Sequence, residues 1–280
     1  MARNGVGQAC LGILAAYLSL FAGEPAADPS TVLRVATLNV AHGRGLAYNQ
    51  TGLPPEAFER NLEALARVVR REAPEVLAIQ EADGPSAWSA GFDHVAWLAQ
   101  ATAFEHVYHG VHFKVGAWKM GVEYGTALLA RRPLLSPASL RFRTPLVHTK
   151  GFVLAEVELE GRPLVVTSVH LESGSAAIRR VQVDMIVNAL TERAKPVVLM
   201  GDLNSRWENE SDAVRLLAAR LHLRAYRPED PGLGTFRSTT PRTRIDWILI
   251  SEKLEFVDYA VWPDQVSDHL GVAASLRWRP

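Results

Sequence analysis

Residues 196–205, Pro-Val-Val-Leu-Met-Gly-Asp-Leu-Asn-Ser, constrain the fold of this chain more than any other segment. The apolar part has the composition of a buried strand, and a glycine, Asp202 and Asn204 end it abruptly. Side chains two residues apart on extended chain point the same way, so the carboxylate and the carboxamide can project together. Strand ends of this kind often carry catalytic groups. The same pattern also occurs in ordinary turns, so its interpretation depends on the rest of the chain.

Other strand-like runs also carry a polar side chain where the run begins or ends. These residues are Asn39, Glu81, His170, Asp246, Asp268 and His269. The runs themselves span residues 32–39, 75–81, 164–170, 246–250 and 270–276. Polar residues at the ends of several strands predict that these ends converge on one site.

The remaining pattern of the chain predicts helices and hairpins. Apolar residues recur at helical spacing over residues 56–71, 93–102, 176–193 and 212–221. Further strands are expected at residues 105–111 and 124–130, and a hairpin over residues 152–170 turns at residues 160–162. Three strands are expected to close the chain after residue 243. This mixture favours an α/β layered sandwich over a purely parallel sheet.

Length and charge limit the class of protein. A chain of 280 residues can bury a full core, and we expect one domain over residues 28–280 and a monomer. The 30 Lys and Arg residues balance the 30 Asp and Glu residues. A net charge of zero argues against affinity that comes mainly from a broad cationic surface, although it permits a nuclease with a local basic groove.

The first residues have the features of a secretory signal. Arg3 supplies a positive charge and residues 11–23 form a short apolar run, which together predict a signal peptide and short leader over residues 1–27. The run is too short for a comfortable membrane span, so we expect a secreted or periplasmic protein with no stable membrane span. A disordered or interfacial segment is the alternative. Because Cys10 is the only cysteine, cleavage would leave no disulfide, thiol nucleophile or thiolate metal site.

The strand-end motifs as a set resemble the endonuclease/exonuclease/phosphatase superfamily of deoxyribonuclease-I-like, metal-dependent phosphoesterases. The motifs are Thr37-Leu-Asn39, Ile79-Gln-Glu81, Val169-His-Leu171, Gly201-Asp-Leu-Asn204, Ile245-Asp246 and Ser267-Asp-His269. They occur in the order of the family. The resemblance implies a four-layer αββα sandwich, in which two packed mixed sheets are flanked by helices and the site lies at one edge of the sheets.

The resemblance also implies a site for Mg²⁺ or Mn²⁺, hard cations that prefer oxygen ligands. Glu81 is the expected carboxylate ligand, and Asn39 would add an amide oxygen or hold the ligands in place. Asp268 would be a ligand or would support one. Each residue has an ordinary alternative, because Asn39 could cap a turn and Glu81 could close a strand in solvent.

The catalytic roles implied by the resemblance fit the needs of phosphodiester hydrolysis, which are charge neutralisation, an activated water and a stabilised leaving oxygen. Asp202 would orient or deprotonate the water, and Asn204 would hold a phosphate oxygen. His269 would contact the phosphate while Asp246 fixes its tautomer. His170 would donate to a phosphate oxygen or assist the leaving group. A strand-start acid and a satisfied histidine are the ordinary alternatives for Asp246 and His170.

Three further residues resemble supporting positions of the family. Arg179 and Gln182 match an Arg-x-x-Gln pattern that follows the histidine motif in many members, and we expect them to brace the site loops. Lys150, in Lys-Gly-Phe, looks like a segment of lipid- and headgroup-cleaving members. The loop His42-Gly-Arg44 could place a cation beside the substrate, although a flexible loop explains its composition equally well.

We therefore predict a secreted or periplasmic, divalent-metal-dependent phosphodiester hydrolase. Its partner would be a phosphoester substrate, either nucleic acid or a phospholipid headgroup. A sphingomyelinase-like headgroup phosphodiesterase and an inositol-phosphate phosphatase are alternatives within the family. A non-catalytic phosphoester-binding module is the alternative of another class, and the presence of Glu81, Asp202 and His269 argues against it.

Overall fold

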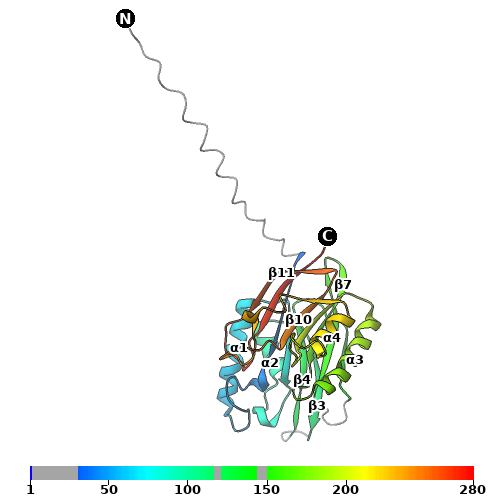
Figure 1. Ribbon diagram of the computed structural model, residues 1–280. Helices are drawn as coiled ribbons and strands as arrows, with labels where there is room; N and C mark the ends of the chain where they lie inside the picture. Colours follow the sequence, from blue (N-terminus) through cyan, green and yellow to red (C-terminus); the bar gives the residue numbers. More distant parts are fainter. Residues whose placement is uncertain (2–30, 117–120, 144–149) are drawn as a thin grey trace.

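The computed structural model of the chain describes residue 1 and residues 31–116, 121–143 and 150–280. These residues form two six-stranded sheets that pack face to face, with helices on both outer faces (Figure 1). The expected αββα sandwich is therefore confirmed. Apart from Met1, the predicted signal peptide and Cys10 lie outside the described residues.

The first sheet has the strand order β11-β12-β1-β2-β4-β3. Its strands are β1 (Leu33–Asn39), β2 (Val76–Asp83), β3 (His106–Val115), β4 (Val122–Ala130), β11 (Leu254–Val261) and β12 (Val272–Trp278). Helices α1 (Pro55–Glu72) and α2 (His94–Thr102) accompany this sheet, on the left in Figure 1. Only β1 and β2 pair in parallel here, and α1 connects them.

The second sheet has the order β5-β6-β7-β8-β10-β9. Its strands are β5 (Leu135–Arg141), β6 (Gly151–Leu159), β7 (Arg162–His170), β8 (Val197–Asp202), β9 (Leu223–Ala225) and β10 (Asp246–Ser251). Helices α3 (Ala176–Arg193) and α4 (Ala213–Arg220) accompany it, on the right in Figure 1. Here β7 and β8 are the parallel pair, and α3 connects them. Short 3₁₀ helices span Ala41–Gly43, Ala87–Ser89 and Pro231–Leu233.

Burial of apolar side chains follows these four layers. One cluster, which includes Val35 and Val166, fills the space between the sheets. A second joins the first sheet to α1 and α2, and a third joins the second sheet to α3 and α4. Central strands covered on both faces must be apolar throughout, which explains the unbroken apolar runs that end at the polar motifs. Among the described residues, no helix combines the length and apolarity needed to cross a membrane.

Helix α1 shows how the local sequence sets these boundaries. It begins at Pro55, where proline is favoured because the first turn leaves its N–H groups unpaired. The apolar positions from Phe58 to Val69 are buried, and Leu65 and Val69 among them pack in the cluster that joins α1 to the first sheet. Ala73 then adopts a left-handed φ of 47° and donates its N–H to the carbonyl of Val69, which ends the helix before Pro74.

Two strands escaped the sequence analysis, and one strand begins later than expected. Strand β5 contains Pro137 and a register shift between Leu135 and Ala138, which a strand at the edge of a sheet tolerates. Strand β9 has three residues, too few to produce a pattern. Strand β12 begins at Val272 rather than Leu270, because the N–H of Leu270 donates to the carbonyl of Thr235 in a loop.

A buried polar contact links the two sheets just below their polar edge. Gln80 of β2 donates from Nε2 to the hydroxyl of Ser168 on β7 over 2.9 Å. The same hydroxyl donates to the carbonyl of Ile79 over 2.9 Å, and Gln80 also bonds to Thr37 of β1. Because every partner is buried, these bonds hold β2 and β7 in a defined register across the interface.

Candidate active site

The polar strand ends of both sheets meet at one edge of the sandwich. Asn39, at the end of β1, donates from Nδ2 to Glu81 Oε1 over 3.2 Å and to Asp202 Oδ2 over 3.1 Å. Nε2 of His170 lies 3.5 Å from Asp202 Oδ2 and 3.8 Å from Glu81 Oε1. Residues from both sheets therefore share one site, as the strand-end pattern predicted.

Backbone conformations at this edge are unusual. Glu81 has a φ of 50° at a bulge in β2, where the pairing with β4 shifts between Gln80 and Ala82. Asn204 has a φ of 45° directly after β8. Side chains other than glycine avoid this left-handed region unless the surrounding structure holds them there. The bulge aims Glu81 out of the ladder, a recurrent use of bulges near active sites.

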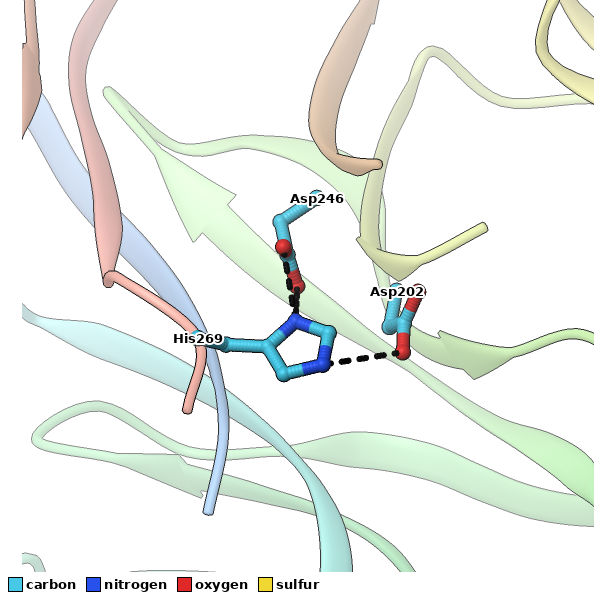
Figure 2. Close-up of side chains that lie close together, drawn as sticks. All are labelled: Asp202, Asp246 and His269. Carbon is cyan, nitrogen blue, oxygen red and sulfur yellow. Dashed lines mark hydrogen bonds and ion pairs between the residues drawn. The ribbon is translucent and has the colours of Figure 1, made fainter. Parts of the chain in front are cut away.

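Three side chains form a chain where the second sheet ends: Asp202 of β8, Asp246 of β10, and His269 from the loop before β12 of the first sheet (Figure 2). Asp246 accepts from Nδ1 of His269 at 2.9 Å and from the hydroxyl of Thr235 at 2.6 Å. The other ring nitrogen, Nε2, lies 3.9 Å from Asp202 Oδ2. The carboxylate of Asp246 thus fixes both the tautomer and the ring orientation of His269.

Within this group of three side chains, His269 and Asp202 form an oppositely charged pair. Burial alone would lower the pKa of His269, but the charges of Asp246 and Asp202 outweigh it and raise that pKa above its ordinary value. Burial raises the pKa of Asp202, and the positive charge of His269 only partly offsets this effect. A cationic imidazole and a carboxylate of raised basicity therefore face the same space.

The three side chains Asp202, Asp246 and His269 place one potential ligand atom each within 4.8 Å of one another, which is also compatible with a metal ion. The hydrogen bonds argue against a metal site formed by these three side chains. Asp246 already accepts from His269 and Thr235, and Nδ1 of His269 is committed to that contact. We therefore interpret this group as a hydrogen-bonded chain rather than a metal cage.

His170 and Lys150 form a second basic pair beside Asp202. Lys150 donates from Nζ to Nε2 of His170 over 2.8 Å and to the carbonyl of Leu171 over 2.7 Å. Burial and the neighbouring charge of Lys150 lower the pKa of His170 well below its ordinary value. His170 is thus a neutral acceptor, and Lys150 is the proton-bearing cation of this pair. The sequence suggested a donor role for His170 and did not predict that His170 accepts from Lys150.

The two asparagines of the site orient its carboxylates. Asn39 Oδ1 accepts from the backbone N–H of Ala41 at 2.9 Å, which turns its NH₂ group toward the carboxylates. Of its two expected roles, this orientation suits holding Glu81 in place better than supplying a ligand oxygen. The backbone N–H of Asn204 donates to Asp202 Oδ1 over 2.9 Å, and its side-chain amide donates to the carbonyl of Leu171. One N–H of that amide is left for substrate.

Glu81 fits the expected role as a ligand for a divalent cation. Its side chain is 24% exposed, so an ion can reach the carboxylate from solvent. Asp268 is occupied differently, because its Oδ2 accepts from Arg44 at 2.7 Å. That ion pair joins the loop after β1 to the segment before β12, which suits a supporting role for Asp268. The donor set around Glu81, oxygen and imidazole nitrogen, fits a divalent cation.

A second histidine–carboxylate pair, which the sequence did not predict, lies beside Glu81. His42 Nδ1 lies 2.6 Å from Asp83 Oδ1, and His42 Nε2 lies 3.4 Å from Glu81 Oε2. The rings of Trp88 and Tyr124 contact the imidazole edge to face, with centroids 5.1 and 4.9 Å away. The spacing of Glu81 and Asp83 was the available signal, but the intervening bulge hid how they face His42.

Arg179 and Gln182 lie on α3 and contact the loop that follows His170. Arg179 forms a bidentate ion pair with Asp212 at 2.8 and 2.9 Å and donates to the carbonyls of Glu172 and Ser173. Gln182 accepts from the backbone N–H of Glu172. Their contacts are those of residues that hold a site loop in place.

The chain is similar to known proteins in sequence pattern and in fold. The model of the endonuclease/exonuclease/phosphatase family matches residues 36–269. No curated protein matches the chain. An endonuclease/exonuclease/phosphatase from Beutenbergia cavernae DSM 12333 is similar in structure, with a TM-score of 0.71, 23% identity, and coverage of 89% of this chain and 72% of that one.

Two other solved structures of similar fold carry more specific descriptions. A mannosyl-6-phosphatase from Bacteroides thetaiotaomicron VPI-5482 has a TM-score of 0.66 and 15% identity, with 88% of this chain and 100% of that chain covered. The human Nocturnin catalytic domain has a TM-score of 0.65 and 16% identity, with 89% and 95% covered. At these identities the likeness shows the fold alone.

Proposed function

Since this chain belongs to the endonuclease/exonuclease/phosphatase family, whose members hydrolyse phosphoester bonds and generally depend on divalent metal ions, we propose that it is a metal-dependent phosphodiester hydrolase. The observation that carries the proposal is the placement of Asp202. Its Oδ1 accepts from the N–H of Asn204, while its Oδ2 faces Asn39, His170 and His269. A carboxylate held in this way suits the activation of a water molecule.

In this proposal Asp202 takes a proton from the attacking water. Its raised pKa favours that role, because a general base works best when its pKa lies near the working pH. His269, held as a cation by Asp246, stabilises negative charge on the phosphate. Asn204 donates to a phosphate oxygen. A divalent cation beside Glu81 would supply further charge neutralisation on the phosphate and its leaving oxygen.

Lys150 is placed to act on the leaving group. Its ammonium donates to His170 and Leu171, and burial lowers its pKa while Asp202 and Glu81 act in the opposite direction. A lysine of lowered pKa can give up a proton to an alkoxide more readily than an exposed one. We propose that Lys150 donates that proton and that His170, which accepts from its ammonium, holds the ammonium in place.

The substrate is proposed at the level of its ester. A phosphodiester of nucleic acid or of a phospholipid headgroup remains the first candidate, and a phosphomonoester is the second because one similar fold is a mannosyl-6-phosphatase. We also propose that the protein is secreted or periplasmic and monomeric, on the basis of the predicted leader over residues 1–27 and the predicted single domain.

The test is a panel of substrates assayed with the chain from residue 28 onward, in Mg²⁺ or Mn²⁺ and then in EDTA. The panel contains plasmid DNA, RNA, sphingomyelin, inositol phosphates, a sugar phosphate and an aryl phosphodiester. We expect EDTA-sensitive hydrolysis. Asp202→Asn should lower kcat by about 10³-fold, since loss of a general base costs about 10²- to 10⁴-fold.

Asp184→Asn is the matched control, because Asp184 is exposed on α3 and pairs with Arg220 at the surface. It should hydrolyse the best substrate at the wild-type rate. Full activity of Asp202→Asn would refute the assigned role of Asp202. Tight phosphoester binding without turnover or metal dependence would favour the non-catalytic binding module instead.

A further inference from the structure

His42 lies on a short turn whose backbone holds it in an unusual conformation. It has a φ of 53° and a ψ of 27°, and Ala41 before it has a φ of 48°. The turn follows β1 directly, so it presents the imidazole beside the bulge that carries Glu81. Left-handed residues that do not end a helix are commonly retained at functional sites.

The imidazole of His42 is locked in one orientation. Trp88 and Tyr124 contact it edge to face, at interplanar angles of 65° and 86°. Asp83 lies 2.6 Å from Nδ1 and is itself held by the indole N–H of Trp88 and the hydroxyl of Ser89, each at 2.7 Å. Because a carboxylate accepts, Nδ1 carries a hydrogen, and in the neutral ring Nε2 keeps its lone pair.

That lone pair faces a carboxylate oxygen. Nε2 of His42 lies 3.4 Å from Oε2 of Glu81, while the other oxygen, Oε1, accepts from Asn39. Two electron-rich atoms at this separation repel each other unless something positive lies between them. The candidates are a second proton on the imidazole and a metal ion.

The separation matches that of two ligands on one cation. Ligand atoms about 2.1 Å from a metal ion are about 3.0 Å apart at a right angle and about 3.4 Å apart at the tetrahedral angle. The corresponding gap between Nε2 of His269 and Oδ2 of Asp202, 3.9 Å, is wider than either. Exposure differs as well, because the side chain of Glu81 is 24% exposed and that of Asp202 is 2% exposed.

From this geometry we propose that His42 is a metal ligand, binding through Nε2 the same divalent cation as Glu81, with Asp83 as its orienting carboxylate. A ligating histidine usually donates its other ring N–H to a carboxylate, as His42 does to Asp83. The inference deepens the proposed function and rests on it. It adds a nitrogen ligand to a site for which the sequence predicted oxygen ligands only.

A nitrogen ligand changes which ion the site prefers. Imidazole favours the later first-row transition metals, whereas Mg²⁺ prefers oxygen and keeps most of its water. The site should therefore bind Co²⁺ more tightly than Mg²⁺. Replacement of the imidazole should weaken Co²⁺ binding by about 10- to 100-fold and leave Mg²⁺ binding within about 3-fold.

His42→Asn is the variant of choice. Asparagine tolerates the left-handed backbone and keeps an N–H donor for Asp83, but it has no ligand atom in the position of Nε2. His222→Asn is the matched control, because His222 is exposed, has a φ of 51°, and lies after α4 near Ser251, at the opposite end of β10 from Asp246. Both variants receive Co²⁺ and Mg²⁺ in calorimetric titrations.

Proton NMR of the Co²⁺ form provides a readout of the ligand itself. A cobalt-bound imidazole shifts its remaining N–H far outside the usual range, and here that N–H is the one held by Asp83. We expect such a resonance in the wild type and in His222→Asn, and its loss in His42→Asn. Unchanged Co²⁺ affinity in His42→Asn, or survival of the resonance, would overturn the proposal in favour of a protonated His42 paired with Glu81.

Two further variants distinguish a failure of the proposed His42 ligation from a failure of the proposed metal-dependent function. His42→Gly suits the positive φ and removes the ring, and added imidazole should restore its Co²⁺ affinity if the ring is a ligand. An absence of rescue in folded His42→Gly would count against ligation. Glu81→Gln should lose both cations. If the wild type bound neither cation, the proposed function itself would fail, whereas unchanged binding in His42→Asn alone would remove only His42.

Discussion

Two similar arrangements of side chains at the polar edge differ in what surrounds them. At the second-sheet end, Asp246 and Asp202 flank His269, which comes from the loop before β12 of the first sheet. At the first-sheet end, Asp83 and Glu81 flank His42. In each arrangement an aspartate fixes Nδ1 of a histidine, and Nε2 faces a second carboxylate. The gap beyond Nε2 is 3.9 Å at the second-sheet end and 3.4 Å at the first-sheet end.

Burial decides what such an arrangement of side chains can do. Asp202 and His269 are both buried, so each stabilises the ionised form of the other. Neither side chain is exposed enough to exchange ions with bulk water. Glu81 is open enough to take an ion from solution, and aromatic rings hold His42 beside it. One end is suited to moving a proton, and the other is suited to holding a cation.

Replacement by asparagine of the two aspartates that orient the histidines, Asp246 and Asp83, should have the largest effect on the difference between the two ends. Asp246→Asn should lower kcat by about 10- to 100-fold and leave Co²⁺ affinity unchanged, since it disturbs only the orientation and charge of His269. Asp83→Asn should lower Co²⁺ affinity by a similar factor, through His42. Steady-state kinetics and calorimetry on both variants measure this. Equal effects of the two changes on both quantities would show that the two ends do not divide the work.

The next prediction concerns the hydrogen bonds of Ser168, which join the two sheets. Ser168→Ala removes the hydroxyl that accepts from Gln80 and donates to the carbonyl of Ile79. Leaving such buried partners unsatisfied should cost about 1–3 kcal/mol of unfolding free energy. Urea denaturation measures the loss, with exposed Ser139→Ala as the control. An unchanged midpoint would mean that apolar packing alone holds the sheets in register.

The smallest expected effect concerns the loop behind the second-sheet end. Burial opposes ionisation of Asp212, but the hydrogen bonds from Arg179 outweigh it and lower the pKa of this carboxyl. A lowered folded-state pKa contributes stability above the unfolded value of about 3.9, and this contribution is lost as pH falls through the folded value. The melting temperatures of wild type and Asp212→Asn should therefore converge below about pH 4. A constant difference down to pH 2 would contradict this.

Many of the residues of this site could be predicted from the sequence because they lie at the ends of apolar strands. A central strand must be apolar on both faces, so the first polar residues after it stand out, as Asp202 and Asn204 do after β8. The helical stripe of α1 was readable for a similar reason, since its spacing reports one buried face.

The missing half of the site depends on local conformations that no periodicity encodes. The pairing of His42 with Asp83 requires the left-handed turn after β1 and the bulge at Glu81, both of which the tertiary structure imposes. The contact between Lys150 and His170 arises because β6 and β7 pair with Gly151 opposite His170. Register, bulges and strained turns set these distances, and they follow from packing rather than from residue order.

The most direct test of the account measures turnover and metal binding together in two variants. Asp202→Asn should bind Co²⁺ with wild-type affinity while its phosphodiester turnover falls by about 10³-fold. Glu81→Gln should lose both Co²⁺ binding and turnover. This result would place proton transfer at the second-sheet end and the cation at the first-sheet end. Loss of Co²⁺ binding in Asp202→Asn, together with retained binding in Glu81→Gln, would contradict the account.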